Sequence, residues 1–236
     1  TTLSHRQPFS GGVTSVFLEE QFQAASWLTL NGGVRLTHFS GAINENAADP
    51  RVGASIRVPR LGWVVRGFYG RYYQPPPLST VSGPLLAFAT ANGFGFLPLY
   101  GERDEQHEFG LTIPARGWTL DFASFRTGAS NFFDHDALGN SNIFLPVTIA
   151  RARIHGYEGT VRSPQIWHRA SFHLAYSNQT VLGRGGVAGG LTDFSPPDEG
   201  FFYLDHDQRN TLSLGGEATL PKRSWASASV TYGSGF

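Results

Sequence analysis

Two short clusters in this sequence combine carboxylates with imidazole, the side chains that could ligate a metal ion. They are Asp134-His135-Asp136 and Asp205-His206-Asp207, and such groups could bind Ca²⁺ or Zn²⁺. Adjacent residues on a strand point to opposite faces, so one triplet does not easily supply three ligands. We therefore interpret both clusters as solvated loop and strand-entry residues, and we predict no metal site.

Residue patterns typical of catalysis are not recognisable. The chain has no cysteine and no Gly-x-Ser-x-Gly elbow. The glycine-rich run at residues 183–190 lacks the Lys-Ser/Thr pair and the helix of a phosphate-binding loop, and we expect it to be an outer loop. A pair of carboxylates for glycoside hydrolysis is an alternative that the sequence leaves open, because the distance between two carboxylates cannot be read from a sequence. We expect no enzyme and no cofactor.

A long connection at residues 75–103 carries the strongest candidate for ligand binding. Long loops on a rigid scaffold commonly bind ligands, and aromatic rings with Arg suit a flat or anionic ligand. The alternative is that these rings pack the loop or belong to an outer aromatic girdle. The predicted ligand-binding residues are Tyr72, Tyr73, Phe94, Phe96, Tyr100 and Arg103.

The composition excludes several classes of protein. Lys+Arg and Asp+Glu are both 18, so the formal net charge is zero, which argues against a nucleic-acid binder held by phosphate contacts. The absence of cysteine excludes a disulfide scaffold. Charged residues make up 15% of the chain, against the usual ~25% of soluble domains. Apolar surface must therefore be hidden somewhere other than in an ordinary core.

Apolar and polar residues alternate with a period of two along much of the chain. Between residues 28 and 37, Leu and Val alternate with Thr, Asn and Arg. The same pattern recurs at residues 51–58, 169–176, 211–214 and 226–232. Such alternation is typical of strands with one apolar and one polar face, and no helical periodicity is sustained.

The predicted connections are of two kinds, which alternate. Short ones lie at residues 24–26, 59–62, 114–117, 164–166 and 221–224, and long ones at about 41–49, 74–103, 133–148 and 181–205. Each short connection is followed by one of the five tryptophans: Trp27, Trp63, Trp118, Trp167 and Trp225. We predict five hairpins and a tryptophan girdle at one membrane interface.

Unlike loops at two ends, with aromatic residues at one of them, are typical of outer-membrane barrels. The polar face would include Glu108, Asp121 and Glu158, which requires a wide lumen. We therefore predict an all-β fold, a transmembrane antiparallel up-and-down β-barrel that is incomplete, with about ten strands of a larger barrel. Residues 1–236 would be part of a single barrel domain. The alternative is a soluble sandwich or propeller with Trp at repeated turns.

Four stretches resemble, in consistent order, the barrel of a TonB-dependent outer-membrane receptor. The first, at residues 17–22 and 28–39, has a Gly-x-Arg-x-x-x-Phe ending, and the second, at 50–55 and 67–76, ends in an aromatic–Pro corner. The third comprises 102–109, 118–125 and Gly156-Tyr157-Glu158-Gly159. The fourth is 205–212, where Asn210 stands in place of the common His. The ordered set carries the resemblance.

The resemblance implies a barrel of about 22 strands with a plugged lumen, of which this chain would be under half. The plug domain and at least one terminal strand would lie outside it. It implies a place in the bacterial outer membrane, in contact with its lipid, and uptake of a scarce small-molecule nutrient such as a siderophore, cobalamin or an oligosaccharide. The TonB energy-coupling complex would be a partner through the missing N-terminal part, and no nucleic acid would be bound. A passive porin, an adhesin barrel and a soluble β-rich binding module are the alternatives.

Overall fold

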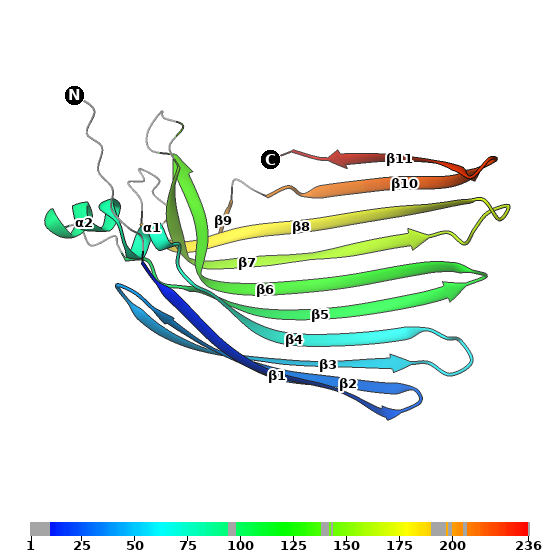
Figure 1. Cartoon of the computed structure of the whole chain (residues 1–236), viewed down its shortest axis with the longest axis horizontal. Coiled ribbons are helices and arrows are strands. Elements are labelled where there is room, and N and C mark those ends of the chain that lie inside the picture. Colours follow the sequence, from blue (N-terminus) through cyan, green and yellow to red (C-terminus); the bar gives the residue numbers. More distant parts are fainter. Residues whose placement is uncertain are drawn as a thin grey trace.

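A computed structural model describes residues 10–93, 98–137, 142, 144–189, 197, 200–204 and 207–235. One antiparallel sheet of eleven strands runs through them (Figure 1). Ten strands pair in sequence order, and β9 pairs with β8 beside this path. The strands are β1 (Gly12–Ala25), β2 (Leu28–Ser40), β3 (Asn44–Arg57), β4 (Val64–Gln74), β5 (Glu102–Ala115), β6 (Trp118–Ala137), β7 (Phe144–Arg162), β8 (Ala170–Ala188), β9 (Phe202–Tyr203), β10 (Asn210–Leu220) and β11 (Ser224–Gly233). The predicted up-and-down order is confirmed.

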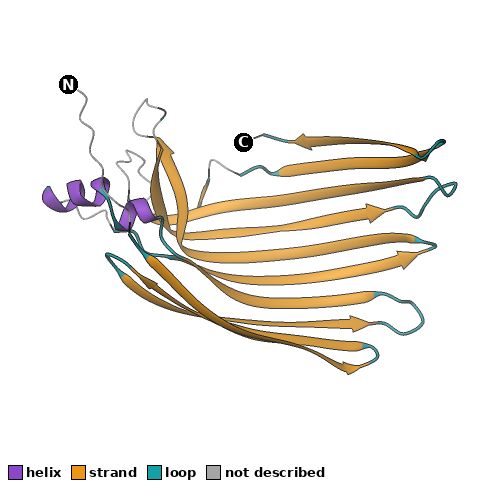
Figure 2. Ribbon diagram, viewed as in Figure 1, coloured by secondary structure: helices purple, strands orange, loops and turns teal. Residues whose placement is uncertain are grey.

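The sheet curves into a trough and does not close. Within the described residues, β1 pairs only with β2, and β11 only with β10. Short turns lie at one end of the trough, and longer connections with two helices lie at the other (Figure 2). We call these the short-turn end and the long-loop end. The prediction of an incomplete barrel is thereby confirmed.

The ladder register sorts the side chains of the sheet onto two faces. Leu18 of β1 is opposite Val34 of β2, and Glu19 is opposite Gly33, so apolar positions align with apolar ones across the strands. One face, the apolar face, carries large side chains that lie in the open: Leu18 is 75% exposed and Val230 of β11 is 68% exposed. The other, the polar face, lines the inside of the trough. The wall therefore has no core of its own.

Buried apolar side chains gather at the long-loop end instead. Ala89 and Leu99 form one cluster with Leu85 and Leu86. A second cluster brings Ile149 of β7, Val181 of β8 and Leu204 together. The first cluster packs the β4–β5 connection against itself, and the second holds Leu204 against β7 and β8. Packing at this end therefore fixes the loops rather than the sheet.

Two helices lie in the connection between β4 and β5, α1 (Leu78–Val81) and α2 (Pro84–Ala91). Gly83, with a φ of 88°, precedes α2, and Pro84 occupies its first turn, where a missing N–H costs little. At the other end the Asn92 side chain donates to the Phe88 carbonyl at 2.8 Å. The period-two alternation of the sequence does not predict these helices. No helix in the described ranges is long and apolar enough to cross a membrane.

Three of the predicted long connections are wrong in their bounds. The one expected at 41–49 is only residues 41–43, because β3 begins at Asn44 and pairs fully with β2. The one expected at 133–148 is largely a hairpin, since Ala137 of β6 pairs with Phe144 of β7. β8 continues to Ala188 through most of the glycine-rich run expected to be a loop. In each case the strands stay paired beyond the segment in which apolar and polar residues alternate. The alternation therefore does not predict where these strands end.

Candidate functional site

The predicted ligand-binding residues do not form one group. Tyr72 and Tyr73 precede Gln74, the last residue of β4, and Arg103 follows Glu102, the first residue of β5. Tyr72 lies under the guanidinium of Arg51, which is 5.2 Å from the ring centroid. Tyr100 is 57% exposed. Phe94 and Phe96 lie outside the described residues. Among the described members of the predicted set, Tyr73 and Arg103 are the pair that contact each other.

Tyr73 and Arg103 meet at Glu45 of β3, a residue that the sequence analysis did not single out. The Tyr73 hydroxyl donates to Glu45 Oε2 at 3.1 Å, and the Gly101 N–H donates to the same oxygen at 2.7 Å. Arg103 lies 3.5 Å from Glu45 Oε1, and its guanidinium is 5.1 Å from the Tyr73 ring centroid. We call Glu45, Tyr73, Gly101 and Arg103 the Glu45 cluster. It ties the end of the β4–β5 connection to β3.

The Glu45 cluster occupies a gap between two strands. The β3–β4 ladder ends at the pair Arg51–Gly70, although both strands continue beyond it. Burial, reinforced by the negative charge of Glu45, raises the pKa of Tyr73, so its hydroxyl stays protonated and donates. Tyr73 and Arg103, which were predicted to bind a ligand, therefore connect β3 to its neighbours where the β3–β4 backbone pairing has ended.

A second buried carboxyl lies next to this cluster, at Glu102. Its side chain accepts a hydrogen bond from the Phe133 N–H of β6 at 2.6 Å, and the residue is only 7% exposed. Burial raises the pKa of Glu102 to about 7, and the neighbouring Asp104 carboxyl adds to this effect. Glu102 therefore titrates near neutral pH, at the point where β5 meets the β6–β7 hairpin.

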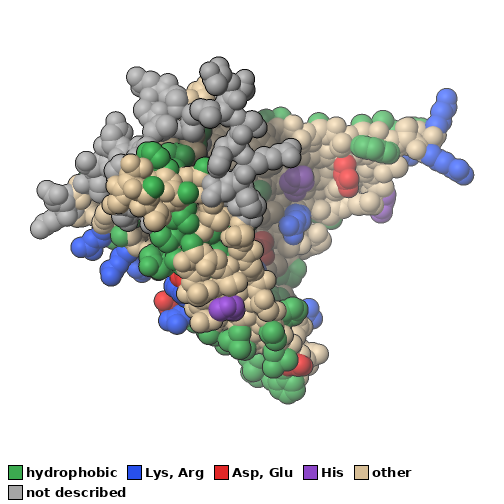
Figure 3. Space-filling view, turned by 60° about the vertical axis from the view of Figure 1, so that its left-hand side comes forward, with side chains coloured by type: hydrophobic (Ala, Val, Ile, Leu, Met, Phe, Trp, Pro, Cys, Tyr) green, Lys and Arg blue, Asp and Glu red, His purple; other side chains and the backbone are tan. Residues whose placement is uncertain are grey.

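The polar face carries a charged network further along the trough. Arg66 of β4 donates from Nη1 and Nη2 to the two oxygens of Asp121 of β6, at 3.0 and 2.7 Å. Thr112 Oγ1 donates to Asp121 at 2.5 Å, and Glu108 lies 3.7 Å from Arg66 Nε. This bidentate pairing is the strong form of an ion pair. Figure 3 shows acidic, basic and His side chains along the hollowed wall.

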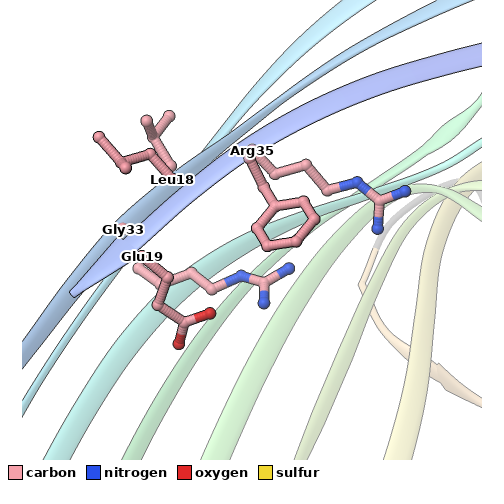
Figure 4. Close-up of a pocket in the computed structure, with 7 residues that line it drawn as sticks. Leu18, Glu19, Gly33 and Arg35 are labelled. Carbon is pink, nitrogen blue, oxygen red and sulfur yellow. The ribbon is translucent and has the colours of Figure 1, made fainter. Parts of the chain in front are cut away.

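Several hollows open on this face, and two of them involve residues already named. One, of about 440 Å³, is lined by the Arg66 network together with Glu158 and Gln179. The other, of about 200 Å³, lies between β1, β2 and β3 and contains Phe17, Glu19 and Arg35. In Figure 4, Glu19 and Arg35 lie on one side of the ribbon and Leu18 on the other. The sequence prediction that Glu108, Asp121 and Glu158 face inward agrees with this geometry.

The five tryptophans predicted as a girdle are all at the short-turn end, but they do not share one face. Trp118 begins β6 opposite Ala115 and packs edge-on against Phe172, with ring centroids 5.2 Å apart. Trp225 pairs with Thr219 and shares the polar-face positions of β11. Trp167, in a turn with φ of 51°, is 86% exposed. The girdle stays a prediction.

The acidic–His clusters do not assemble a metal site in the part of the chain that the structure describes. Asp134, His135 and Asp136 lie on β6, where His135 Nδ1 is 3.7 Å from Asp134 and its ring packs against Phe144. Asp205 and His206 lie outside the described residues, whereas Asp207 pairs with Arg209 at 2.6 Å. The absence of a metal site at the two triplets stays a prediction.

A comparison with known proteins agrees with this architecture. The profile of the family described as TonB dependent receptor-like, beta-barrel, matches residues 5–236. This chain therefore belongs to the TonB-dependent receptor β-barrel family. No curated protein sequence matches it.

Several solved structures share the fold at low sequence identity. The FrpB iron transporter from Neisseria meningitidis (F3-3 variant) aligns with a TM-score of 0.61 at 12% identity, over 94% of this chain and 33% of that one. The copper transporter OprC gives 0.62 at 13%, over 94% and 39%. The ferripyoverdine receptor of the outer membrane of Pseudomonas aeruginosa gives 0.59 at 14%, over 94% and 31%. The chain thus spans between 31% and 39% of the length of these three solved chains.

Proposed function

We propose that this chain forms part of the wall of an outer-membrane receptor that takes up a scarce nutrient by coupling to TonB. The observation that carries the proposal is the two-faced sheet, in which large apolar side chains lie in the open opposite a wall of paired charges. In a membrane the apolar face would contact lipid, and the polar face would line a wide lumen. The family match over residues 5–236 supports the same assignment.

The long-loop end is where the nutrient would first bind. The Glu45 cluster and the small core around Ala89 and Leu99 hold the β4–β5 connection in a fixed shape, and Tyr100 presents an exposed ring beside them. The polar face would line the route inward once a plug domain, supplied by another part of the receptor, has moved. Because similar structures include iron and copper transporters, a metal chelate such as a ferric siderophore is the first nutrient to test.

Uptake by intact cells tests the proposal. The complete receptor would be expressed in a strain lacking its own siderophore receptors, and uptake of labelled iron from a panel of ferric siderophores, cobalamin and oligosaccharides would be followed. We expect the protein in the outer-membrane fraction and one nutrient to accumulate only while TonB is present. Uptake that is independent of TonB would indicate a passive porin instead. Recovery without detergent in the soluble fraction would indicate a soluble binding module.

A control separates ligand capture from barrel assembly. Glu158→Ala alters the polar face away from the long-loop end and should leave nutrient binding to cells unchanged. Deletion of residues 84–91, which make up α2, should weaken binding while the barrel still reaches the membrane. Equal binding by both variants would contradict the placement of the site at the long-loop end.

A further inference from the structure

The apolar face changes character along β6, β7 and β8. From the short-turn end of β6 its positions are Leu120 and Phe122, and then Ser124 and Arg126. Tyr157 of β7 lies where the apolar positions give way to polar ones. The centroid of its ring is 6.5 Å from that of Phe122 and 6.1 Å from that of Tyr176. Tyrosine rings of this kind favour the boundary between hydrocarbon and headgroups. Positions beyond them would lie at headgroup level.

A hollow of about 550 Å³ opens on this face just beyond the tyrosines. Cross-strand pairing builds it, because His155 of β7 is opposite both Arg126 of β6 and Thr180 of β8. Its polar lining residues are Ser124, Arg126, Arg153, His155, Asn178 and Thr180. All can donate hydrogen bonds, with one donation of the Asn178 amide already made to Asn210 Oδ1 at 2.9 Å, and none is a carboxylate.

Among the described residues, the arginines of this hollow lie apart from the ion pairs of the sheet. No carboxylate in the described part of the chain lies within ion-pair distance of Arg126 or Arg153. On the neighbouring β4–β5 pair, by contrast, Arg71 has Glu105 at 4.0 Å. Like charges that are held together on one surface repel each other unless an anion joins them. The hollow therefore presents a site for an anion.

Phe201 orients the arginine side of the hollow. Arg153 and Arg184 both lie over its ring, 4.6 and 5.5 Å from the centroid. A guanidinium that stacks by its face keeps the N–H groups at its edge available, and this fork matches the oxygens of a phosphate. The site is therefore partly preorganised.

We propose that this hollow binds a phosphate group of an anionic lipid in the outer leaflet of the membrane. Arg126, Arg153 and His155 would hold the phosphate, Asn178 and Thr180 would donate to its oxygens or to the adjoining sugar, and the acyl chains would lie along Phe122 and the apolar band below. Free phosphate has the same chemistry. The lipid is favoured because the hollow opens on the membrane-facing side, directly beside the tyrosine boundary. This inference rests on the proposed outer-membrane location.

Binding of a defined lipid to the complete receptor in detergent tests the proposal. The probe is lipid A with two phosphates, compared with the same lipid after dephosphorylation and with inorganic phosphate, and bound lipid is counted by native mass spectrometry. The double variant R126Q/R153Q should weaken binding about tenfold or more, because charge-assisted hydrogen bonds are lost. R126K/R153K should retain part of it. The control is Arg162→Gln. Arg162 lies on β7, as Arg153 does, but on the polar face, where it is opposite Thr119 and His173.

Three results would overturn the proposal: equal binding of the dephosphorylated lipid, an equal loss in Arg162→Gln, or displacement of the lipid by an equal concentration of inorganic phosphate. If R126Q/R153Q fails to fold, the comparison of the two lipids on the unchanged receptor still decides. A receptor that reaches the outer membrane and imports its nutrient, yet shows no phosphate preference, would refute this inference and leave the proposed function standing.

Discussion

Neighbouring residues of β10 lie on opposite faces of the sheet and have different surroundings. Leu212 and Leu214 lie on the apolar face, and Leu214 is opposite Leu174 of β8 and Val230 of β11. Ser213 and Glu217 lie on the polar face, where Glu217 accepts a hydrogen bond from Ser171 at 3.1 Å. Both faces are open in the isolated chain, so exposure does not distinguish them. The difference teaches that the cost of a substitution here depends on which face it enters.

The largest expected effect comes from placing a charge on the apolar face. Leu214→Arg should destabilise the membrane-inserted barrel by about 2–4 kcal/mol, because the side chain would meet hydrocarbon near the middle of the strand. Ser213→Arg, one position away on the polar face, should change stability by less than about 1 kcal/mol. Urea unfolding of the complete receptor in phospholipid vesicles measures both, and similar losses in the two variants would contradict the assignment of faces.

The next largest effect should come from the charged network of the polar face. Asp121→Ala leaves Arg66 without its bidentate partner and should cost about 1–3 kcal/mol, the range for charge-assisted hydrogen bonds. Glu158→Ala is the matched control, since its one hydrogen bond, from Ser177, is 3.4 Å long. Equal unfolding midpoints for the two variants would show that the network does not brace the wall.

The pH dependence of stability should reveal the titration of Glu102 at the long-loop end. Its folded pKa of about 7 lies above the ordinary value of 4.5, so between these values the folded state holds more protons than the unfolded state. Stability contributed by this group is therefore full below about pH 4.5 and falls as the pH rises to about 7.

Two variants isolate that titration. Glu102→Gln keeps the group neutral and should flatten the stability profile between pH 4.5 and 7. Glu105→Gln, on the exposed opposite face of β5, should keep the slope of the unchanged protein. Thermal unfolding followed across this pH range provides the measurement, and a slope that persists in Glu102→Gln would assign the titration to another group.

The smallest effect concerns the Glu45 cluster. Tyr73→Phe removes one of the hydrogen bonds to Glu45 and should loosen the β4–β5 connection by about 1 kcal/mol, because Gly101 and Arg103 still hold the carboxylate. In Tyr72→Phe the ring that lies under Arg51 is kept, so this variant should behave as the unchanged protein. Hydrogen exchange of residues 75–101 measures the difference. Equal protection in both variants would rule out a bracing role for Tyr73.

The fold was predictable because the sheet has one apolar and one polar face, so that apolar and polar residues alternate along each strand. The alternation in residues 28–37 predicted both the strand and its faces, and the tryptophans marked the short turns. The strand extensions at the long-loop end were not predictable in the same way. Asn44 to Asp49 form a strand by backbone pairing with β2, although their side chains resemble those of a loop.

The candidate site was predicted only in part, because its partners come from distant strands. Tyr73 and Arg103 were chosen as aromatic and cationic ligand contacts, but Glu45, which joins them, lies 28 residues from Tyr73 in the chain. The cationic hollow on β6–β8 depends on the register that sets Arg126 opposite His155. A sequence shows residue types, whereas pairing decides which of them meet.

The most direct test of the two-faced wall is the environment of successive residues on one strand. Single cysteines at residues 172–177 of β8, introduced into the complete receptor free of other cysteines, would carry a nitroxide in lipid vesicles. Collisions with oxygen report contact with lipid. The account predicts high oxygen accessibility at Phe172, Leu174 and Tyr176, and low accessibility at His173, Ala175 and Ser177. Accessibility that does not alternate along these six positions would contradict it.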